Sequence, residues 1–190
     1  MNKAIPLSRY IVFFTLAVGI CAADLATKSL AFARLGMPGP DSKIWWLWKG
    51  VFGFQTSLNT GGLFGLGQGF ALLLAAMSIC AAVGIVVWLF PVGAARDRVL
   101  TIALGLVAAG IFGNLYDRLG LPGLKWPVGY PDQQPGDTVY AVRDFILMIE
   151  IGRWHWPNYN LADCSLVCGA ALLVWHTLFA KGEGGMMNVE

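Results

Sequence analysis

The stretch NYNLADCSLVCGAALLVWHTLFA, residues 158–180, begins as a polar turn and continues as an apolar run. Because a helix needs about 20 predominantly apolar residues to cross a bilayer, residues 161–180 predict a membrane helix. Asp163 lies just inside this run, where an ionised side chain is costly. Asn160 and Asp163 have the spacing of a capping box, and a carboxylate in the first turn suits the helix dipole, so this aspartate also has a local structural explanation.

Three further apolar runs have the same character and lie at about residues 10–31, 70–90 and 99–116. The composition agrees with a membrane protein, because 57% of the 190 residues are hydrophobic and only 13% are charged. In an ordinary soluble domain about a quarter of the residues are charged. A chain of this length suits one domain. The sequence therefore predicts an α-helical membrane protein with four transmembrane helices in a single domain, residues 1–190.

Lysine and arginine residues indicate how the helices are oriented. They are concentrated in short segments on one side of the predicted helices, at Lys3, Arg9, Arg96, Arg98 and Lys181. The positive-inside rule therefore places both termini in the cytoplasm and the longer segments, about 32–69 and 117–160, outside it. The first apolar run is long for a signal peptide and lacks a small-x-small cleavage site, so we expect an uncleaved membrane anchor.

The two outer segments predict a small β-rich cap. VFGFQTSL at 51–58 and TVYAVRDFILMIEI at 138–151 are rich in strand-forming residues, and NTGG at 59–62 is a turn signal. IWWLWKG at 44–50 groups tryptophans as in the aromatic belts at membrane surfaces. Residues 119–137 contain four prolines and four glycines, which predicts a loop rather than a helix.

Strongly polar residues collect at the outer ends of the predicted helices. With the amino terminus inside, this group comprises Asp24, Lys28, Asn114, Asp117, Arg118, Asn160 and Asp163, and Asp144 lies in the outer segment before the last helix. Ionisable residues within membrane segments usually face a bundle interior or a water-filled cavity, and they are functional candidates. The pattern therefore predicts a functional site near the outer leaflet.

These residues also have structural interpretations, which the sequence leaves open. Asp24 and Lys28 are four residues apart, in the favourable order for an ion pair within one helix. Asp117 and Arg118 suit ordinary interfacial charges at a helix end, and Asp144 suits a solvated strand residue. A turn alone accounts for an asparagine at the start of NTGG.

Other residue classes argue against several functions. The cysteines all lie in apolar segments without a metal-binding spacing, so we expect packing residues rather than disulfides or metal ligands at Cys21, Cys80, Cys164 and Cys168. A net charge of +2 without a basic cluster argues against a nucleic-acid partner. His155 and His176 have no apparent nucleophile partner, and we expect a loop residue and an interfacial residue.

Five short motifs resemble, in the same order, those of bacterial lipoprotein signal peptidase, also called signal peptidase II. They are DLATK at 24–28, NTGGLFGL at 59–66, GIFGNLYDRL at 110–119, VRDFI at 142–146 and WHWPNYNLADCSL at 154–166. Leu25 stands where the family usually has glutamine, and Gly62 and Leu63 stand where it has alanines. The resemblance spans most of the chain.

The resemblance implies an aspartic endopeptidase of the bacterial cytoplasmic membrane. Its substrate would be a prolipoprotein whose cysteine carries diacylglycerol, cut just before that cysteine without a metal or other cofactor. By motif position Asp144 and Asp163 would form the catalytic dyad, and Asp24 and Lys28 would be structural. The residues expected to bind substrate or support the dyad are Asn59, Gly110, Asn114, Arg118, Val142 and Asn160. One bundle can hold this site, so we expect a monomer that contacts substrate and membrane lipid.

Paired carboxylates suit this chemistry, because two that lie close together cannot easily ionise at once and one retains a proton. The ionised carboxylate takes a proton from water while the other polarises the scissile carbonyl, and the two titrate as a coupled pair. Residues 119–137 make the segment between Arg118 and Asp144 longer than is usual in the family. This stretch suits a lid, a substrate-selecting loop or a lineage-specific addition.

Two other classes of function are compatible with parts of the pattern. A small transporter or proton-coupled channel would use Asp24, Lys28 and Asp163 as a charge relay. Such a relay favours polar residues through the whole membrane depth, whereas the inner halves of the predicted helices are apolar. A membrane scaffold would use polar residues to join helices, but it does not need two aspartates on separate segments.

Overall fold

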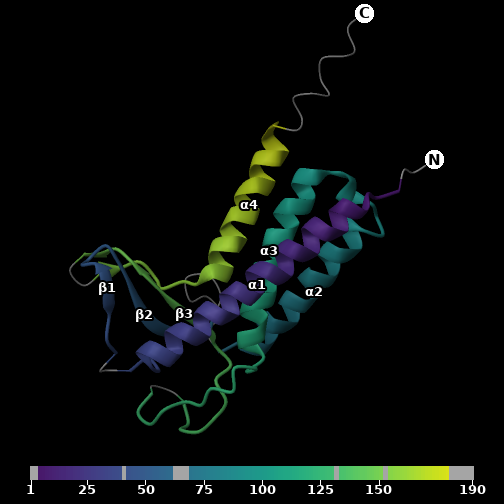
Figure 1. Cartoon of the computed structure of the whole chain (residues 1–190). Helices are drawn as coiled ribbons and strands as arrows, with labels where there is room; N and C mark the ends of the chain where they lie inside the picture. The colour runs from purple at the N-terminus through teal and green to yellow at the C-terminus, as the bar shows by residue number, and fades with distance from the viewer. Residues whose placement is uncertain (1–3, 40–41, 62–68, 131–132, 152–153, 180–190) are drawn as a thin grey trace, which may run out of the picture.

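The computed structural model describes residues 4–39, 42–61, 69–130, 133–151 and 154–179. Its long helices are α1 (Leu7–Leu35), α2 (Ala71–Leu89), α3 (Arg98–Arg118) and α4 (Leu161–Phe179) (Figure 1). By length and composition, all four are apolar enough to cross a membrane. The helices predicted from the apolar runs are therefore confirmed, and the last three begin and end within two residues of the predicted bounds.

The first helix is longer than its apolar run predicts. Hydropathy marks only the part of a helix that suits lipid, whereas α1 continues through Arg34 until the backbone itself turns. Gly36 ends the helix with a φ of 80°, which glycine adopts at little cost, and its N–H donates to the Phe32 carbonyl at 3.0 Å. The additional turn carries Arg34 beyond the apolar part of α1.

The cap is built on a three-stranded antiparallel sheet in the order β1 (Trp45–Trp48), β2 (Phe52–Asn59), β3 (Val142–Met148). A second, two-stranded sheet pairs β4 (Glu150–Ile151) with β5 (Trp154–His155). The strand predicted at 51–58 is confirmed and the tryptophan-rich stretch at 44–50 contributes the edge strand β1. The strand predicted at 138–151 is shorter, because Ile149 has a φ of 52° and interrupts the extended backbone.

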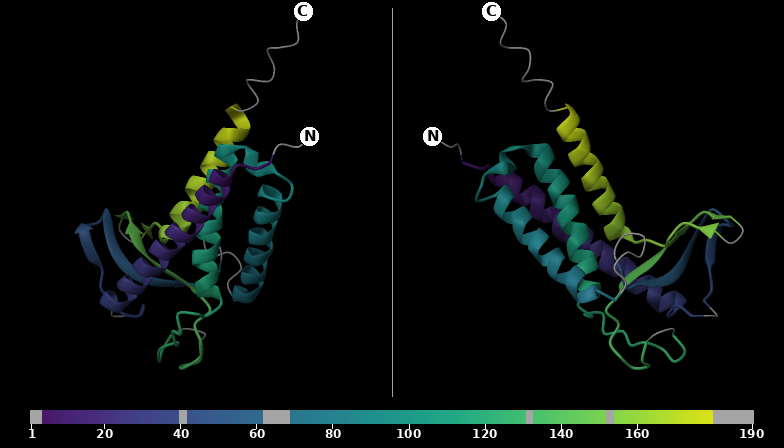
Figure 2. Two further views of the ribbon diagram at one scale, coloured as in Figure 1. Left: turned by 45° about the vertical axis from the view of Figure 1, so that its right-hand side comes forward. Right: turned by 180° about the vertical axis from the view of Figure 1, so that it is seen from behind.

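The helix bundle has one end that carries the sheet and one that does not. Figures 1 and 2 show the start of α1 and the end of α4 at the same end of the bundle, opposite the sheet. The central helix is α3, because 61% of its most apolar window is buried, compared with 17% for each of the other three helices. The polar residues in the last turns of α3 therefore lie inside the protein, at the sheet end.

Glycines allow α3 and α4 to approach closely. A Cβ atom on Gly110 would lie 2.5 Å from the Ala162 carbonyl oxygen and 2.5 Å from Cγ of Leu166. On the other side of the crossing, a Cβ atom on Gly169 would lie 2.8 Å from the Ala103 carbonyl oxygen. Small residues are the usual means by which membrane helices bring their backbones together. Gly110 is thus a packing position of the bundle, and its expected contact with substrate stays a prediction.

We expect Gly110→Val to destabilise the bundle, because the added side chain overlaps the backbone of α4. Overpacking of this kind costs about 1–3 kcal/mol. The control is Gly84→Val on α2, where no atom lies within 4 Å of an added Cβ. Thermal unfolding in detergent measures both variants, and equal melting temperatures for the two would contradict the close crossing of α3 and α4.

The described part of residues 119–137, together with the residues just after it, forms a packed ribbon rather than a helix. The Val139 N–H donates to the Leu124 carbonyl at 3.0 Å, and the Trp126 N–H donates to the Asp137 carbonyl at 2.9 Å. The Trp126 side chain is only 4% exposed. It belongs to a core cluster with Phe32, Leu58, Val139 and Ala141. The ribbon is therefore attached to the end of α1 and to β2.

Candidate active site

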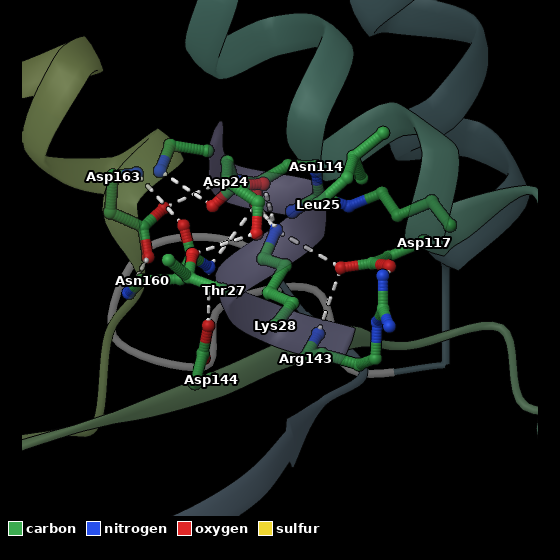
Figure 3. Close-up of polar contacts among 12 residues, drawn as sticks. Asp24, Leu25, Thr27, Lys28, Asn114, Asp117, Arg143, Asp144, Asn160 and Asp163 are labelled. Atoms are coloured by element: carbon green, nitrogen blue, oxygen red, sulfur yellow. Dashed lines mark hydrogen bonds and ion pairs between the residues drawn. The ribbon is translucent and has the colours of Figure 1, made fainter. Parts of the chain in front are cut away.

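Lys28 lies at the centre of a buried polar network at the sheet end of the helices (Figure 3). Its Nζ forms an ion pair with Asp24 at 2.8 Å, one turn earlier on α1, and with Asp117 of α3 at 3.0 Å. It also donates a hydrogen bond of 2.9 Å to Oδ1 of Asn114. The ion pair expected from the spacing of Asp24 and Lys28 is confirmed, and both side chains are 0% exposed. The network joins α1 to α3.

Asp117 connects this network to the sheet. Its Oδ1 accepts a hydrogen bond of 2.8 Å from Nε of Arg143, and its Oδ2 accepts one of 3.1 Å from the Arg143 backbone N–H. The interpretation of Asp117 as an interfacial charge is wrong, because its side chain is 0% exposed. The buried set contains two carboxylates and two cations, with Asp24 and Asp117 balanced by Lys28 and Arg143.

The start of α4 has the capping arrangement that its sequence predicts. The backbone N–H of Asp163 donates to Oδ1 of Asn160 at 3.0 Å, and the backbone N–H of Asn160 donates to Oδ2 of Asp163 at 3.2 Å. The remaining oxygen of Asp163, Oδ1, accepts a hydrogen bond of 2.9 Å from Nδ2 of Asn114. The carboxylate is therefore fixed by its own helix and by α3.

Asp144 lies on β3 and contacts the same cap. Nδ2 of Asn160 donates to Oδ1 of Asp144 at 2.6 Å and to Oδ1 of Asn114 at 3.2 Å. One asparagine side chain thus connects the strand aspartate to the turn that holds Asp163 (Figure 3). The interpretation of Asp144 as a solvated strand residue is wrong, because the residue is only 2% exposed.

Burial and a like charge both act on Asp144. Burial raises the pKa of its carboxyl well above the ordinary value, and the nearby Asp163 carboxylate raises it further. The bond from Asn160 opposes these effects but is a smaller influence. Asp144 therefore favours the protonated form at a pH where an exposed aspartate is ionised.

The alternation of side chains along β3 explains why two consecutive charged residues have separate partners. Arg143 contacts Asp117 and the helices, whereas Asp144 contacts Asn160. Successive strand residues point to opposite faces of the sheet. The role of Arg143 was not predicted, although the period of two in VRDFI is a signal that could have separated it from Asp144.

The other expected site residues lie at the end of β2, at the end of α3 and at the start of β3. Asn59 ends β2, and its Oδ1 accepts a hydrogen bond of 2.9 Å from the Gly61 N–H, as a turn residue does. Nη2 of Arg118 donates to the Gly61 carbonyl at 3.2 Å, so the end of α3 contacts the same turn. Val142 is buried and pairs with Asn59 in the sheet. Their expected contacts with substrate stay predictions.

Two further residue classes lie outside this network. All four cysteines are free. Cys21 and Cys164 are half-buried, whereas Cys80 and Cys168 are exposed, so the prediction of packing residues is not confirmed for the latter two. His176, in the last turn of α4, contacts Oδ2 of Asp97 through Nε2 at 2.6 Å. Asp97 is the N-cap of α3, so this pair joins two helices at the end opposite the sheet. The side chain of His155 falls outside the described residues.

Asp144 also borders an open cleft of about 1310 Å³. The cleft lies between the end of α1, β2, residues 127–130 of the packed ribbon and the turn at 157–158. A buried carboxyl group that borders a cleft, and whose pKa is strongly raised, is typical of catalytic sites. The fold and the site together define a membrane-embedded protein with two connected aspartates at one end of its bundle.

Comparisons with known proteins agree with this class. The family model described as Signal peptidase (SPase) II matches residues 16–179. The chain is 46% identical over 173 residues to a lipoprotein signal peptidase of Rhodopirellula baltica, covering 91% of this chain and 74% of the relative. It is 33% identical to a lipoprotein signal peptidase of Rhodococcus jostii, covering 96% of this chain and 80% of the relative.

A solved bacterial membrane enzyme has the same fold, with a TM-score of 0.72 at 20% identity, covering 100% of this chain and 98% of that one. The chain belongs to the signal peptidase II family, a family of aspartic proteases. It is therefore a bacterial membrane protein and an enzyme, which removes the support for the transporter and scaffold interpretations.

Proposed function

We propose that the protein removes signal peptides from prolipoproteins whose cysteine carries diacylglycerol and that it cuts just before this cysteine. The relatives that it resembles are named lipoprotein signal peptidases. The observation that carries the proposal is the side chain of Asn160, which contacts Asp144 directly and caps the turn that holds Asp163. Two carboxylates held in this way suit hydrolysis of a peptide bond by an activated water.

In the proposed mechanism the two aspartates have different protonation states. Asp163 accepts hydrogen bonds from a backbone N–H and from Nδ2 of Asn114, which hold its carboxylate in place. Asp144 is more deeply buried and favours its neutral form. Asp163 would then take a proton from water, and Asp144 would donate its proton toward the scissile carbonyl oxygen as the tetrahedral intermediate forms.

The expected membrane orientation fits this reaction. We propose that both termini are cytoplasmic and that the sheet and the dyad lie near the outer leaflet, as the distribution of lysine and arginine predicts. Water reaches this depth from outside, while the apolar signal peptide remains among lipid. A single chain supplies every residue of the proposed dyad and its supports, so we expect the monomer to be active.

The proposal is tested with purified protein in lipid vesicles and a precursor that carries the diacylglyceryl cysteine. The matched control is the same precursor without the lipid. We expect cleavage of the lipidated form alone, and mass spectrometry should identify a product that begins with the modified cysteine. Cleavage at another bond, or equal cleavage of both forms, would contradict the proposed specificity.

A further inference from the structure

The cleft beside Asp144 extends well beyond the proposed dyad. It is lined by residues 33–39 at and after the end of α1, by residues 55–60 of β2 and the following turn, by residues 127–130 and by the turn at 157–158. Its volume of about 1310 Å³ exceeds the range of roughly 300–1,000 Å³ that is usual for sites of small molecules. The cleft is therefore large enough for several residues of an extended polypeptide.

The wall nearest to Asp144 is polar. Ser57 of β2 is the residue opposite Asp144 in the antiparallel register, and both line the cleft. Gln55 and Asn158 lie further along the same wall, where Nδ2 of Asn158 donates to the Gln55 carbonyl at 2.8 Å. This part of the cleft offers hydrogen-bonding groups to the backbone of an extended polypeptide.

The charge of the described cleft lining is unbalanced. Among the lining residues that the structure describes, Arg34 and Lys43 are exposed cations and Asp144 is the only carboxylate. Within the described part of the chain, neither cation forms an ion pair. This excess of cations among the described lining residues favours an occupant that carries negative charge.

The packed ribbon fixes one wall of the cleft. Trp126 is buried in the core cluster with Phe32, and its ring lies 4.5 Å from the ring of Tyr130, centroid to centroid. Residues 127–129 lie between these two aromatic residues in the chain, and together with Tyr130 they line the cleft. The ribbon therefore supplies one positioned wall of the cleft.

We infer that this cleft binds the segment of the prolipoprotein that follows the modified cysteine, and that Arg34 and Lys43 select segments carrying acidic side chains. The inference rests on the proposed function, because it assigns one side of the cleaved bond to the cleft. The signal peptide on the other side is apolar and remains in the membrane. The segment after the cysteine is free to run from Asp144 along the polar wall of β2.

The test uses three lipidated precursors that differ only in the second to sixth residues after the cysteine, which are rich in glutamate, glutamine or lysine. Cleavage is measured as kcat/KM in vesicles of neutral lipid at low salt. We expect the glutamate precursor to be preferred over the lysine precursor by about threefold to tenfold, the range that two exposed ion pairs provide. The preference should weaken at high salt because ions screen exposed charges.

Variants connect this preference to the cleft. The double variant Arg34→Gln/Lys43→Gln should lose the preference, and Arg34→Glu/Lys43→Glu should reverse it. The control Lys49→Gln changes an exposed cation that does not line the cleft and should leave the preference unchanged. Melting temperatures in detergent verify that every variant is folded.

Four outcomes would overturn the inference. Equal cleavage of the three precursors, or a preference that persists in both double variants, would remove the selective role of the cleft but leave the proposed function intact. A rate that follows the content of anionic phospholipid, independent of the substrate, would assign the two cations to lipid headgroups. Failure to cleave any lipidated precursor would overturn the proposed function as well.

Discussion

Asp144→Asn is expected to abolish cleavage of the lipidated precursor, with kcat lowered by about 10³-fold or more, because general acid–base catalysis by one group contributes about 10²–10⁴-fold. Asparagine has nearly the shape of aspartate, and its Oδ1 can still accept the hydrogen bond from Asn160. The substitution thus removes the titrating proton while preserving the contact. Asp163→Asn should have an effect of similar size, since we propose that the two carboxylates act as a pair.

The pH dependence of cleavage provides a second measurement on the same residue. If Asp144 is the protonated member, kcat falls as the pH rises through its raised pKa. The stability of the folded protein should also decrease as the pH rises. An unfolded aspartate ionises at about pH 3.9, whereas the folded Asp144 stays protonated above this pH. Its contribution to the free energy of unfolding is therefore fully present below about pH 3.9 and is lost as the pH rises through the folded pKa. Asp144→Asn removes this contribution to the dependence.

Retention of full activity by either asparagine variant would exclude the proposed dyad. A matched control is Asp137→Asn, which changes an exposed aspartate of the ribbon. This variant should cleave the precursor at the rate of the unmodified protein. Each substitution replaces one carboxylate oxygen with an NH2 group. The variants therefore differ only in which carboxylate is lost.

Asp117→Asn is expected to have the largest effect on stability. The substitution leaves Lys28 and Arg143 with the single carboxylate of Asp24 in a site that excludes water. Removal of one partner from a buried ion pair typically costs about 3–5 kcal/mol, mostly because the remaining charge is uncompensated. We expect a clearly lower melting temperature in detergent and less protein in membranes.

A second substitution distinguishes charge balance from other effects. In Asp117→Asn/Arg143→Gln, one carboxylate and one cation are lost together, and the Asp24–Lys28 pair remains. We expect this double variant to be more stable than Asp117→Asn alone. In a double-mutant cycle, the loss of stability should then be smaller than the sum of the losses in the two single variants. If Asp117→Asn unfolds at the same temperature as Asp137→Asn, the buried network does not stabilise the fold.

The parts of this protein that could be predicted from its sequence depend on short-range patterns. Apolar runs predicted the four helices, four-residue spacing predicted the Asp24–Lys28 pair, and the Asn160–Asp163 spacing predicted the cap. Each of these patterns is set within a single element. These features can therefore be predicted directly from the sequence.

The parts that were not predicted depend on contacts between elements. Asp117 resembles an ordinary charge at a helix end until β3 brings Arg143 against it. Arg34 and Lys43 resemble ordinary surface cations until β2 and the ribbon enclose the space beside them. In both cases the environment of a residue is created by a segment far away in the chain. The sequence pattern of the residue's own helix or strand therefore does not reveal this environment.

The buried network also bears on how the chain enters the membrane during synthesis. Asp24 and Lys28 pair within α1, so the first helix can enter the membrane with these two charges as a neutral pair before its later partners exist. Asn114 and Asp117 arrive with α3, and the backbone of Ala162, which donates to Oδ1 of Asp24, arrives only with α4. Asp163 is also on α4, so the proposed dyad is incomplete until the last helix docks, and we expect no hydrolytic activity from the nascent chain before then.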